Sequence, residues 1–361
     1  MQDTKSAVQS RTFRLLSPGN VEEVMIERDV MDGEVVVEPI LASVCHADLR
    51  YYMGLRSPEV MAKKLPMALI HEGIGRVIES KADGVEVGQR VVIVPNIPGN
   101  GDSVECSSLC EDEFIGNYNE KNKFLGSGYD GIAQSRLVIP AECAIPVADS
   151  IPNEIAVLSE LCTVSYQALS RIKSKLNSPN SKVAVFGDGP VGYLTAAMIH
   201  HIYGLDASRL IVFGAIPEKL AQFGFAKRAL VQEYDFKTSE KVDVVVECTG
   251  GKFSESAVNQ GIDLLARGGT LVLMGVSEER VPINTRDVLE KGLTLYGSSR
   301  SAYPDFHAVI TAMEDVEYQK TLRAILPAEF NPIHDAKDFM KAMDFAGEHR
   351  SWERVILDFK W

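Results

Sequence analysis

The sequence lacks the features of a membrane, secreted or nucleic-acid-binding protein. Its 361 residues include 37 lysines and arginines against 50 aspartates and glutamates, a net charge of −13. This shortage of positive charge argues against nucleic acid or an anionic membrane surface as the main partner, because both need a clustered basic face. No run reaches the ~18 apolar residues of a membrane span, and the start MQDTKSAVQSR lacks a signal peptide's apolar core. We therefore expect no membrane partner and a cytoplasmic location.

Cysteine is also scarce. The six cysteines are too few and too unevenly spaced for a disulfide framework in a chain of this length, which leaves buried thiols or metal ligands as their roles. They stand at positions 45, 106, 110, 143, 162 and 248. The remaining composition, 45% hydrophobic and 24% charged, is that of an ordinary globular protein, and the length favours two domains.

The chain has two regions with different patterns of secondary structure. From about residue 11 to 150, short β-branched runs alternate with glycine, proline and aspartate, which indicates a β-rich domain. From residue 153, a helical segment is followed by the strand-like runs KVAVFG, RLIVFG, VDVVVECTG and TLVLMG with helices between them, which predicts a parallel sheet covered by helices. We therefore predict an α/β protein with one domain at 1–152, completed by about 301–361, and a second at 153–300.

A glycine-rich turn opens the second domain. The run VAVFGDGPVG contains Gly187, Gly189 and Gly192 as GxGxxG, directly after an apolar strand and before a helix. These glycines permit a tight turn, close approach of the backbone to a pyrophosphate, and close packing of helix on sheet. A purely structural turn would also explain them, but the strand and helix on either side favour dinucleotide binding.

The next strand indicates which dinucleotide binds. It ends at Gly214, where NAD-binding domains usually carry the acid that bonds the ribose 2′-hydroxyl. Because a carboxylate would repel a 2′-phosphate, its absence favours NADP. Lys219 or Arg228 would supply the positive partner, although Lys219 is explained equally well by a solvated helix face.

Four residues have the chemistry of a zinc site. Cys45 follows a strand-like run, His71 and Glu72 lie 26 and 27 residues later, and Glu160 falls in LSELCTVSY. Thiolate, imidazole and carboxylate all bind zinc, and a catalytic zinc keeps one position for water or substrate. Singly, such residues are more often a buried thiol or a satisfied histidine; beside a nucleotide-binding domain they favour a metal.

Motifs along nearly the whole chain resemble those of the zinc-dependent medium-chain dehydrogenases. They are the glycine motif, Cys45, the pair His71-Glu72 followed by GIGRV, VGQRVV at 87–92 and YDGIAQSRLVIP at 129–140. The resemblance implies a GroES-like β-rich catalytic domain, a Rossmann domain and one catalytic Zn²⁺. Zinc held by Cys45, His71 and Glu72 would then polarise a substrate carbonyl, with Glu160 as a fourth ligand that yields to substrate.

Longer segments resemble the ribulose-5-phosphate reductases of that family, also called ribitol-5-phosphate 2-dehydrogenases. They are residues 48–56, 63–72, 94–98, 126–131 and 275–301. This likeness implies NADPH-linked reduction of D-ribulose 5-phosphate to D-ribitol 5-phosphate, which supplies CDP-ribitol for teichoic-acid or capsule synthesis. It also implies a homodimer or homotetramer, and the pathway makes a ribitol-phosphate cytidylyltransferase a plausible partner.

The same resemblance suggests roles for further residues. Asp48 would orient the metal site from behind its ligands. Thr163, the CTG turn at 248–250 and Val276 would contact the nicotinamide and its ribose, and Arg354 would reach the pyrophosphate. These roles come from family likeness alone.

The sequence departs from the family pattern in two places. Ala47 replaces the Ser or Thr that usually relays a proton from the substrate oxygen, and water, Glu72 or Tyr51 remain as alternatives. The four-cysteine structural zinc lobe is also not intact. Cys106 and Cys110 are its only cysteines, and we interpret them as free thiols in preference to an unusual metal site.

A phosphorylated substrate needs a cationic pocket, for which arginine is well suited because it binds phosphate through two parallel hydrogen bonds. The candidates are Arg50, Arg56, Lys63, Lys64 and Arg300. Arg50 and Arg56 are preferred because they follow the metal cysteine closely; the alternative is that some of the five are ordinary surface charges.

Two other functions stay open, a zinc polyol dehydrogenase acting on an unphosphorylated substrate and a non-catalytic NADP-binding protein.

Overall fold

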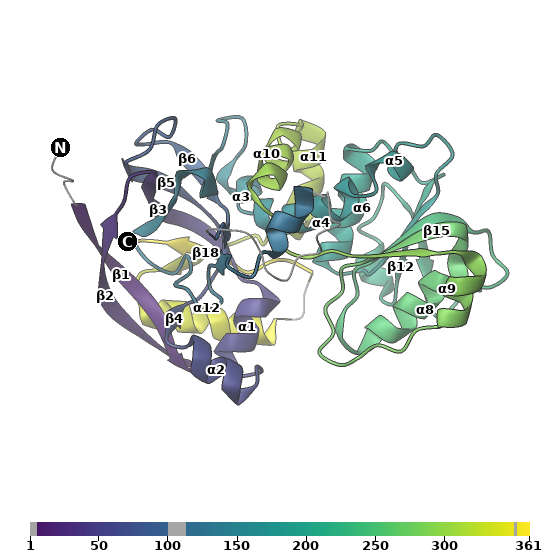
Figure 1. Ribbon diagram of the computed structural model, residues 1–361, viewed down its shortest axis with the longest axis horizontal. Helices are drawn as coiled ribbons and strands as arrows, with labels where there is room; N and C mark the ends of the chain where they lie inside the picture. Colours follow the sequence, from purple (N-terminus) through teal and green to yellow (C-terminus); the bar gives the residue numbers. More distant parts are fainter. Residues whose placement is uncertain (1–5, 100–112, 350–351) are drawn as a thin grey trace. The chain divides into compact units, whose positions relative to one another are not determined.

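The computed structural model describes residues 6–99, 113–349 and 352–361 and divides into two units (Figure 1). The predicted thiols Cys106 and Cys110 lie outside the described residues. One unit contains the chain up to Glu160 together with Arg300–Gln319 and Ile325–Trp361, and the other contains Leu161–Ser299 and Lys320–Ala324. In the described part of the chain, no helix is long and apolar enough to cross a membrane.

The first unit is rich in β-structure. Its largest sheet runs in the order β10-β6-β5-β3-β18-β17, with β9 also paired to β3, and a second sheet has the order β2-β1-β4. The strands are β1 (Ser6–Ser17), β2 (Asn20–Val30), β3 (Glu34–Ser43), β4 (Met67–Ala68), β5 (Glu72–Ser80), β6 (Arg90–Ile93), β9 (Leu137–Pro140), β10 (Ala144–Pro146), β17 (Asn331–Ile333) and β18 (Ile356–Phe359). Strands β7 (Asn96–Ile97) and β8 (Lys123–Phe124) pair antiparallel in a separate two-stranded sheet.

Strand β3 organises this sheet, because it pairs with β5, β9 and β18. Its β-branched run Val35, Val36 and Val37 is fully buried, as expected for a strand whose two faces are both covered. Since β18 pairs antiparallel with β3, the last segment of the chain completes a sheet that begins near the N terminus.

Short helices connect or cover these strands. They are α1 (His46–Tyr52), α2 (Pro58–Lys64), α3 (Asn153–Ala156), α10 (Tyr303–Ala312), α11 (Val316–Leu322) and α12 (Ala336–Glu348). The first, α1, begins directly after Cys45. The strand pair β3 and β5 and the helix α1 are therefore the elements that bring the predicted metal ligands together.

The second unit is a parallel six-stranded sheet in the order β13-β12-β11-β14-β15-β16. Its strands are β11 (Val183–Phe186), β12 (Leu210–Gly214), β13 (Lys227–Leu230), β14 (Val242–Glu247), β15 (Leu265–Leu273) and β16 (Thr294–Gly297). Its helices are α4 (Ser159–Ser170), which begins at the unit boundary, α5 (Lys173–Leu176), α6 (Pro190–His201), α7 (Pro217–Leu220), α8 (Ser254–Leu264) and α9 (Thr285–Lys291). In Figure 1, α8 and α9 lie on one side of the strands and α6 on the other.

This strand order is that of a Rossmann fold, in which the order of the parallel strands reverses between the first and the fourth strand. Here the reversal falls between β11 and β14, which pair in parallel. The phenylalanines Phe186, Phe213 and Phe236 pack together with ring centroids 4.8–5.6 Å apart and fill one side of the sheet. The predicted α/β fold class is therefore confirmed.

A tight turn at 126–131 supports the strand that leads to His71. The amide of Gly131 donates to Ala68 O at 2.8 Å, and the amide of Ile132 donates to Ile70 O at 2.8 Å. A Cβ on Gly131 would overlap the carbonyl oxygens of Leu69 and Ile70. Ile70 itself has a φ of +73°, a conformation that a β-branched residue adopts only when its surroundings impose it.

We expect Gly131→Ala to lower the free energy of unfolding by about 1–3 kcal/mol, because the added methyl group must displace the Leu69–Ile70 backbone. Thermal or urea unfolding measures the change. Gly116→Ala is the matched control, since a Cβ at Gly116 meets nothing within 4 Å. Equal stability of the two variants would contradict this account of the turn.

Candidate metal centre and cofactor site

Three side chains in the first unit converge on one point. Cys45 precedes α1, and His71 and Glu72 stand at the start of β5, whose first residue pairs with Ser43 of β3. One donor atom from each of the three lies within 4.8 Å of the other two. Glu72 is fully buried, His71 is 6% exposed and Cys45 is half-buried. The pairing of β3 with β5 thus closes the gap of 26 residues between the cysteine and the histidine.

Asp48 orients two of these residues from behind. Its Oδ2 accepts the Cys45 amide at 3.0 Å, and its Oδ1 accepts the Ile70 amide at 3.0 Å and lies 3.2 Å from His71 Nδ1. Burial lowers the pKa of His71, but the Asp48 carboxylate more than offsets this and raises the pKa well above its usual range. With Nδ1–H donated to Asp48, His71 presents Nε2 as a ligand atom.

Arg354 and Ser43 hold the third residue. Arg354 Nη2 donates to Glu72 Oε2 at 2.6 Å and to Ser43 Oγ at 2.8 Å, and Arg354 Nε donates to Ser43 Oγ at 3.0 Å. The other carboxylate oxygen, Glu72 Oε1, is buried and has no hydrogen-bond partner among the described residues. A buried carboxylate oxygen without a partner is costly, and a cation in the cluster would satisfy it.

The donor set fits zinc. Sulfur, nitrogen and oxygen donors are the three types that protein zinc sites use, and three protein ligands leave a fourth position for substrate or water. Burial and then the nearby Glu72 carboxylate raise the pKa of the Cys45 thiol. A divalent cation would reverse this effect, because it stabilises the thiolate directly.

Glu160 lies at the start of α4 and is buried. Burial first and then the Glu72 carboxylate raise its pKa to about 8. Among the described residues, the group of mutually close donors consists of Cys45, His71 and Glu72 and does not include Glu160. A role for Glu160 as a fourth ligand therefore stays a prediction.

The cofactor turn follows β11 in the second unit. Gly187 has a φ of +133°, and a Cβ there would lie 3.2 Å from the Cys248 backbone, across the point where the sheet reverses. Gly189 caps α6, and a Cβ on Gly192 would overlap the carbonyl oxygen of Gly187. The turn therefore packs as dinucleotide-binding turns do, with the free amides of α6 available to a pyrophosphate.

Asp188, between the first two glycines, explains why Gly214 carries no side chain. Its Oδ2 accepts the amides of Ala215 and Ile216, both at 2.8 Å. A Cβ on Gly214 would lie 2.6 Å from Asp188 Cβ, so an acid at the end of β12 has no space. Sequence reasoning missed this residue because it considered the end of the strand alone.

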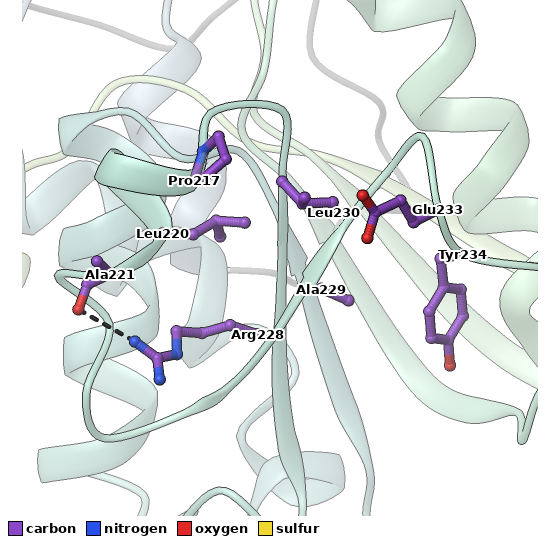
Figure 2. A pocket seen from close by; sticks show the side chains of 8 residues that line it. All are labelled: Pro217, Leu220, Ala221, Arg228, Ala229, Leu230, Glu233 and Tyr234. Atoms are coloured by element: carbon purple, nitrogen blue, oxygen red, sulfur yellow. Dashed lines mark hydrogen bonds between the residues drawn. The ribbon is translucent and has the colours of Figure 1, made fainter.

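A pocket of about 470 Å³ lies between α7 and β13 (Figure 2). Its lining residues are Pro217, Leu220, Ala221, Arg228, Ala229, Leu230, Glu233 and Tyr234. Arg228 Nη1 donates to Ala221 O at 3.2 Å, which ties its guanidinium to the end of α7. Lys219 is half-buried within α7.

The remaining predicted cofactor residues have different surroundings. Thr163 is fully buried in α4, whereas Val276 is 67% exposed and accepts the Gly251 amide at 2.8 Å. The fully buried Glu247 accepts the amides of Thr249 and Gly250 and so fixes the CTG turn. Arg354, expected at the pyrophosphate, has its contacts with Glu72 and Ser43, as described above.

The structure also describes the surroundings of the three arginines predicted to bind the substrate phosphate. Arg50 and Arg56 lie near each other, since burial and then the charge of Arg56 lower the pKa of Arg50. The guanidinium of Arg56 stacks 5.1 Å from the ring centroid of Tyr51. Arg300 is exposed with a φ of +57°, and its carbonyl oxygen accepts Asn117 Nδ2 at 3.3 Å.

Comparison with known proteins gives consistent matches. Residues 31–149 match the alcohol dehydrogenase GroES-like domain, and residues 191–315 match the zinc-binding dehydrogenase family. The chain is 36% identical over 356 residues to ribulose-5-phosphate reductase 1 of Staphylococcus aureus, covering 98% of this chain and 99% of that one. It is 37% identical over 356 residues to the ribulose-5-phosphate reductase of Bacillus spizizenii, covering 97% and 99%.

A solved structure agrees with these matches. The crystal structure of S. aureus TarJ in complex with NADPH superimposes with a TM-score of 0.83 at 32% identity, covering 98% of this chain and 100% of that chain.

We expect Asp48→Asn to weaken zinc affinity about 10- to 100-fold, the usual loss when an outer partner of a ligating histidine is removed. The amide cannot accept from Cys45, Ile70 and His71 together, so the histidine loses its fixed tautomer. Competition against a chromogenic chelator measures the affinity. Asp83→Asn, on an exposed loop, is the control, and equal zinc affinity in both variants would contradict the role given to Asp48.

Proposed function

The chain belongs to the zinc-dependent medium-chain dehydrogenases, among the ribulose-5-phosphate reductases, and we propose that Cys45, His71 and Glu72 hold its catalytic zinc. The enzyme reduces D-ribulose 5-phosphate to D-ribitol 5-phosphate with NADPH, a reaction that serves teichoic-acid synthesis. The observation that carries the proposed ligand set is the convergence of the three donor atoms around the unpartnered Glu72 Oε1.

A zinc ion held by Cys45, His71 and Glu72 would supply Lewis-acid chemistry at the C2 carbonyl of the substrate, where negative charge develops on the oxygen. The chain's own residues prepare the site. Asp48 keeps the His71 proton on Nδ1, and Arg354 fixes the Glu72 carboxylate through Oε2. With Cys45 as a thiolate, three anions, Cys45, Asp48 and Glu72, and one cation, Arg354, give a net charge of −2, which a divalent ion neutralises.

The cofactor is placed by the second unit. We assign the pyrophosphate to the turn at Gly187, Gly189 and Gly192, and the nicotinamide side to Thr163 and Val276. The absence of an acid at Gly214 leaves room for the NADP 2′-phosphate, with Lys219 or Arg228 as its cationic partner. The contacts of Arg354 with Glu72 support a role for it in positioning the metal ligand.

Further roles belong to the same proposal. Arg50, Arg56 and Arg300 are assigned to the substrate phosphate, and the proximity of Arg50 to Arg56 supports the first two. Glu160 is assigned as a fourth ligand that yields to substrate. We also propose a cytoplasmic homodimer or homotetramer, with a ribitol-phosphate cytidylyltransferase as a partner.

We expect the purified, zinc-loaded protein to oxidise NADPH rapidly with D-ribulose 5-phosphate. Turnover should fall to near background after chelation and with unphosphorylated ribulose, and NADH should replace NADPH poorly. Absorbance at the NADPH band follows the reaction. Equal rates with ribulose and its phosphate would instead identify a polyol dehydrogenase for unphosphorylated sugars, and bound zinc and NADPH without any turnover would refute the substrate.

We expect Arg50→Ala to raise the dissociation constant of the sugar phosphate about tenfold or more, because a charge-assisted hydrogen bond to phosphate is lost. The dissociation constant of NADPH should change much less. Isothermal titration of both ligands makes the comparison, with Arg286→Ala, a surface arginine of the second unit, as the control. Equal losses for the two ligands would contradict the assignment.

A further inference from the structure

A second polar cluster in the first unit joins three separate segments. Tyr51 lies near the end of α1, Lys64 is the last residue of α2 and Ser127 lies in the turn at 126–131. Lys64 Nζ donates to Tyr51 OH at 2.9 Å and to Ser127 Oγ at 2.7 Å, and the two hydroxyls lie 3.2 Å apart. In Figure 1, α1 and α2 lie next to each other, as these bonds require.

The cluster has more donors than acceptors. The lysine ammonium has three N–H groups, and the two hydroxyls add one O–H each. Two N–H groups are used on the hydroxyl oxygens, and one O–H is used between the hydroxyls. One N–H and one O–H are left over, so the cluster requires an acceptor from outside these three side chains.

The cluster is also positively charged. Within the described parts of the chain, the partners of Lys64 are these neutral hydroxyls and the Tyr51 ring, 5.5 Å away, and no carboxylate pairs with it. The guanidinium of Arg56 also lies over that ring, 5.1 Å from its centroid. Burial raises the pKa of Tyr51, but Lys64, Ser127 and Arg56 outweigh this effect and lower it. An anionic acceptor is therefore the complement of the cluster.

The cluster adjoins the strand that carries the metal ligands. Gly126, directly before Ser127, approaches Ile70 so closely that a Cβ there would lie 3.2 Å from the Ile70 nitrogen, and Ile70 directly precedes His71. Tyr51 belongs to the helix that begins after Cys45. A small ligand with a carbonyl at one end and a phosphate at the other could place its carbonyl at the proposed metal site and its phosphate at the Lys64 cluster.

We propose that Lys64, Tyr51 and Ser127 bind the phosphate of the substrate, with Arg56 reinforcing them from the side. This inference rests on the proposed function and deepens it, because it names the groups that distinguish a phosphorylated ketose from a free one. It also gives the segments KKLPMALIHE and GSGYDG a role in recognition besides their role in supporting the strand.

The test compares Lys64→Met with Lys63→Met. The two lysines are neighbours on α2, but Lys63 is exposed and outside the cluster, so each variant removes the same charge from nearly the same place. We expect Lys64→Met to lower the ratio of kcat/KM for ribulose 5-phosphate to kcat/KM for ribulose by about 10- to 100-fold. Lys63→Met should change this ratio less than about threefold.

Tyr51→Phe and Ser127→Ala provide independent variants in case Lys64→Met does not fold. Each should lower the same ratio several-fold, since each removes one donor. Equal ratios for Lys64→Met and Lys63→Met would overturn the proposal. A fall in kcat by the same factor for both substrates in Tyr51→Phe, with the ratio unchanged, would also overturn it and would indicate proton transfer instead.

A binding measurement separates this proposal from the proposed function. Inorganic phosphate should raise the Tm of the zinc- and NADPH-loaded wild type and of Lys63→Met, but not that of Lys64→Met. If this pattern holds without turnover of ribulose 5-phosphate, the phosphate site stands and the substrate is wrong. If the wild type prefers ribulose 5-phosphate and Lys64→Met keeps that preference, the function stands and the inference fails.

Discussion

The active site depends on one buried carboxylate. Asp48 accepts the amides of Cys45 and Ile70 and faces His71 Nδ1, so it joins the helix that follows β3 to the strand that begins β5. Among the described residues, Asp48 is the one that contacts both Cys45 and His71, two of the proposed metal ligands. The positive φ of Ile70 is an unfavourable backbone conformation. It accompanies the hydrogen bond from the Ile70 amide to Asp48 Oδ1.

The charged groups near Asp48 carry a net negative charge when Cys45 is a thiolate. Arg354 offsets one of the three negative charges of Cys45, Asp48 and Glu72, and the two that remain suit a divalent cation. In the second unit, carboxylates are likewise held in place, in this case by backbone amides. Asp188 and Glu247 each accept two backbone amides of a neighbouring turn, and both turns border the predicted cofactor site.

The sequence predicted those parts of the molecule whose residues are close together in the chain. The Rossmann strands, the glycine turn and the pair His71-Glu72 are all local patterns, and family likeness linked them to Cys45. The contacts of Arg354 with Glu72, 282 residues away, left no local signal, because strand order in the sheet creates them. Asp188 was missed for a related reason, since its partners Ala215 and Ile216 lie in the turn between β12 and α7. The donor surplus at Lys64 depends on three segments that no spacing rule connects.

The position of Arg354 has a consequence for the making of the protein. Synthesis proceeds from the N terminus, so the three proposed zinc ligands leave the ribosome long before Arg354, which pairs with Glu72, and before β18, which pairs with β3. Until then Glu72 lacks its ion pair with Arg354, and β3 lacks one of its neighbours. The arrangement around Glu72 described above can therefore be complete only after the last segment has been translated.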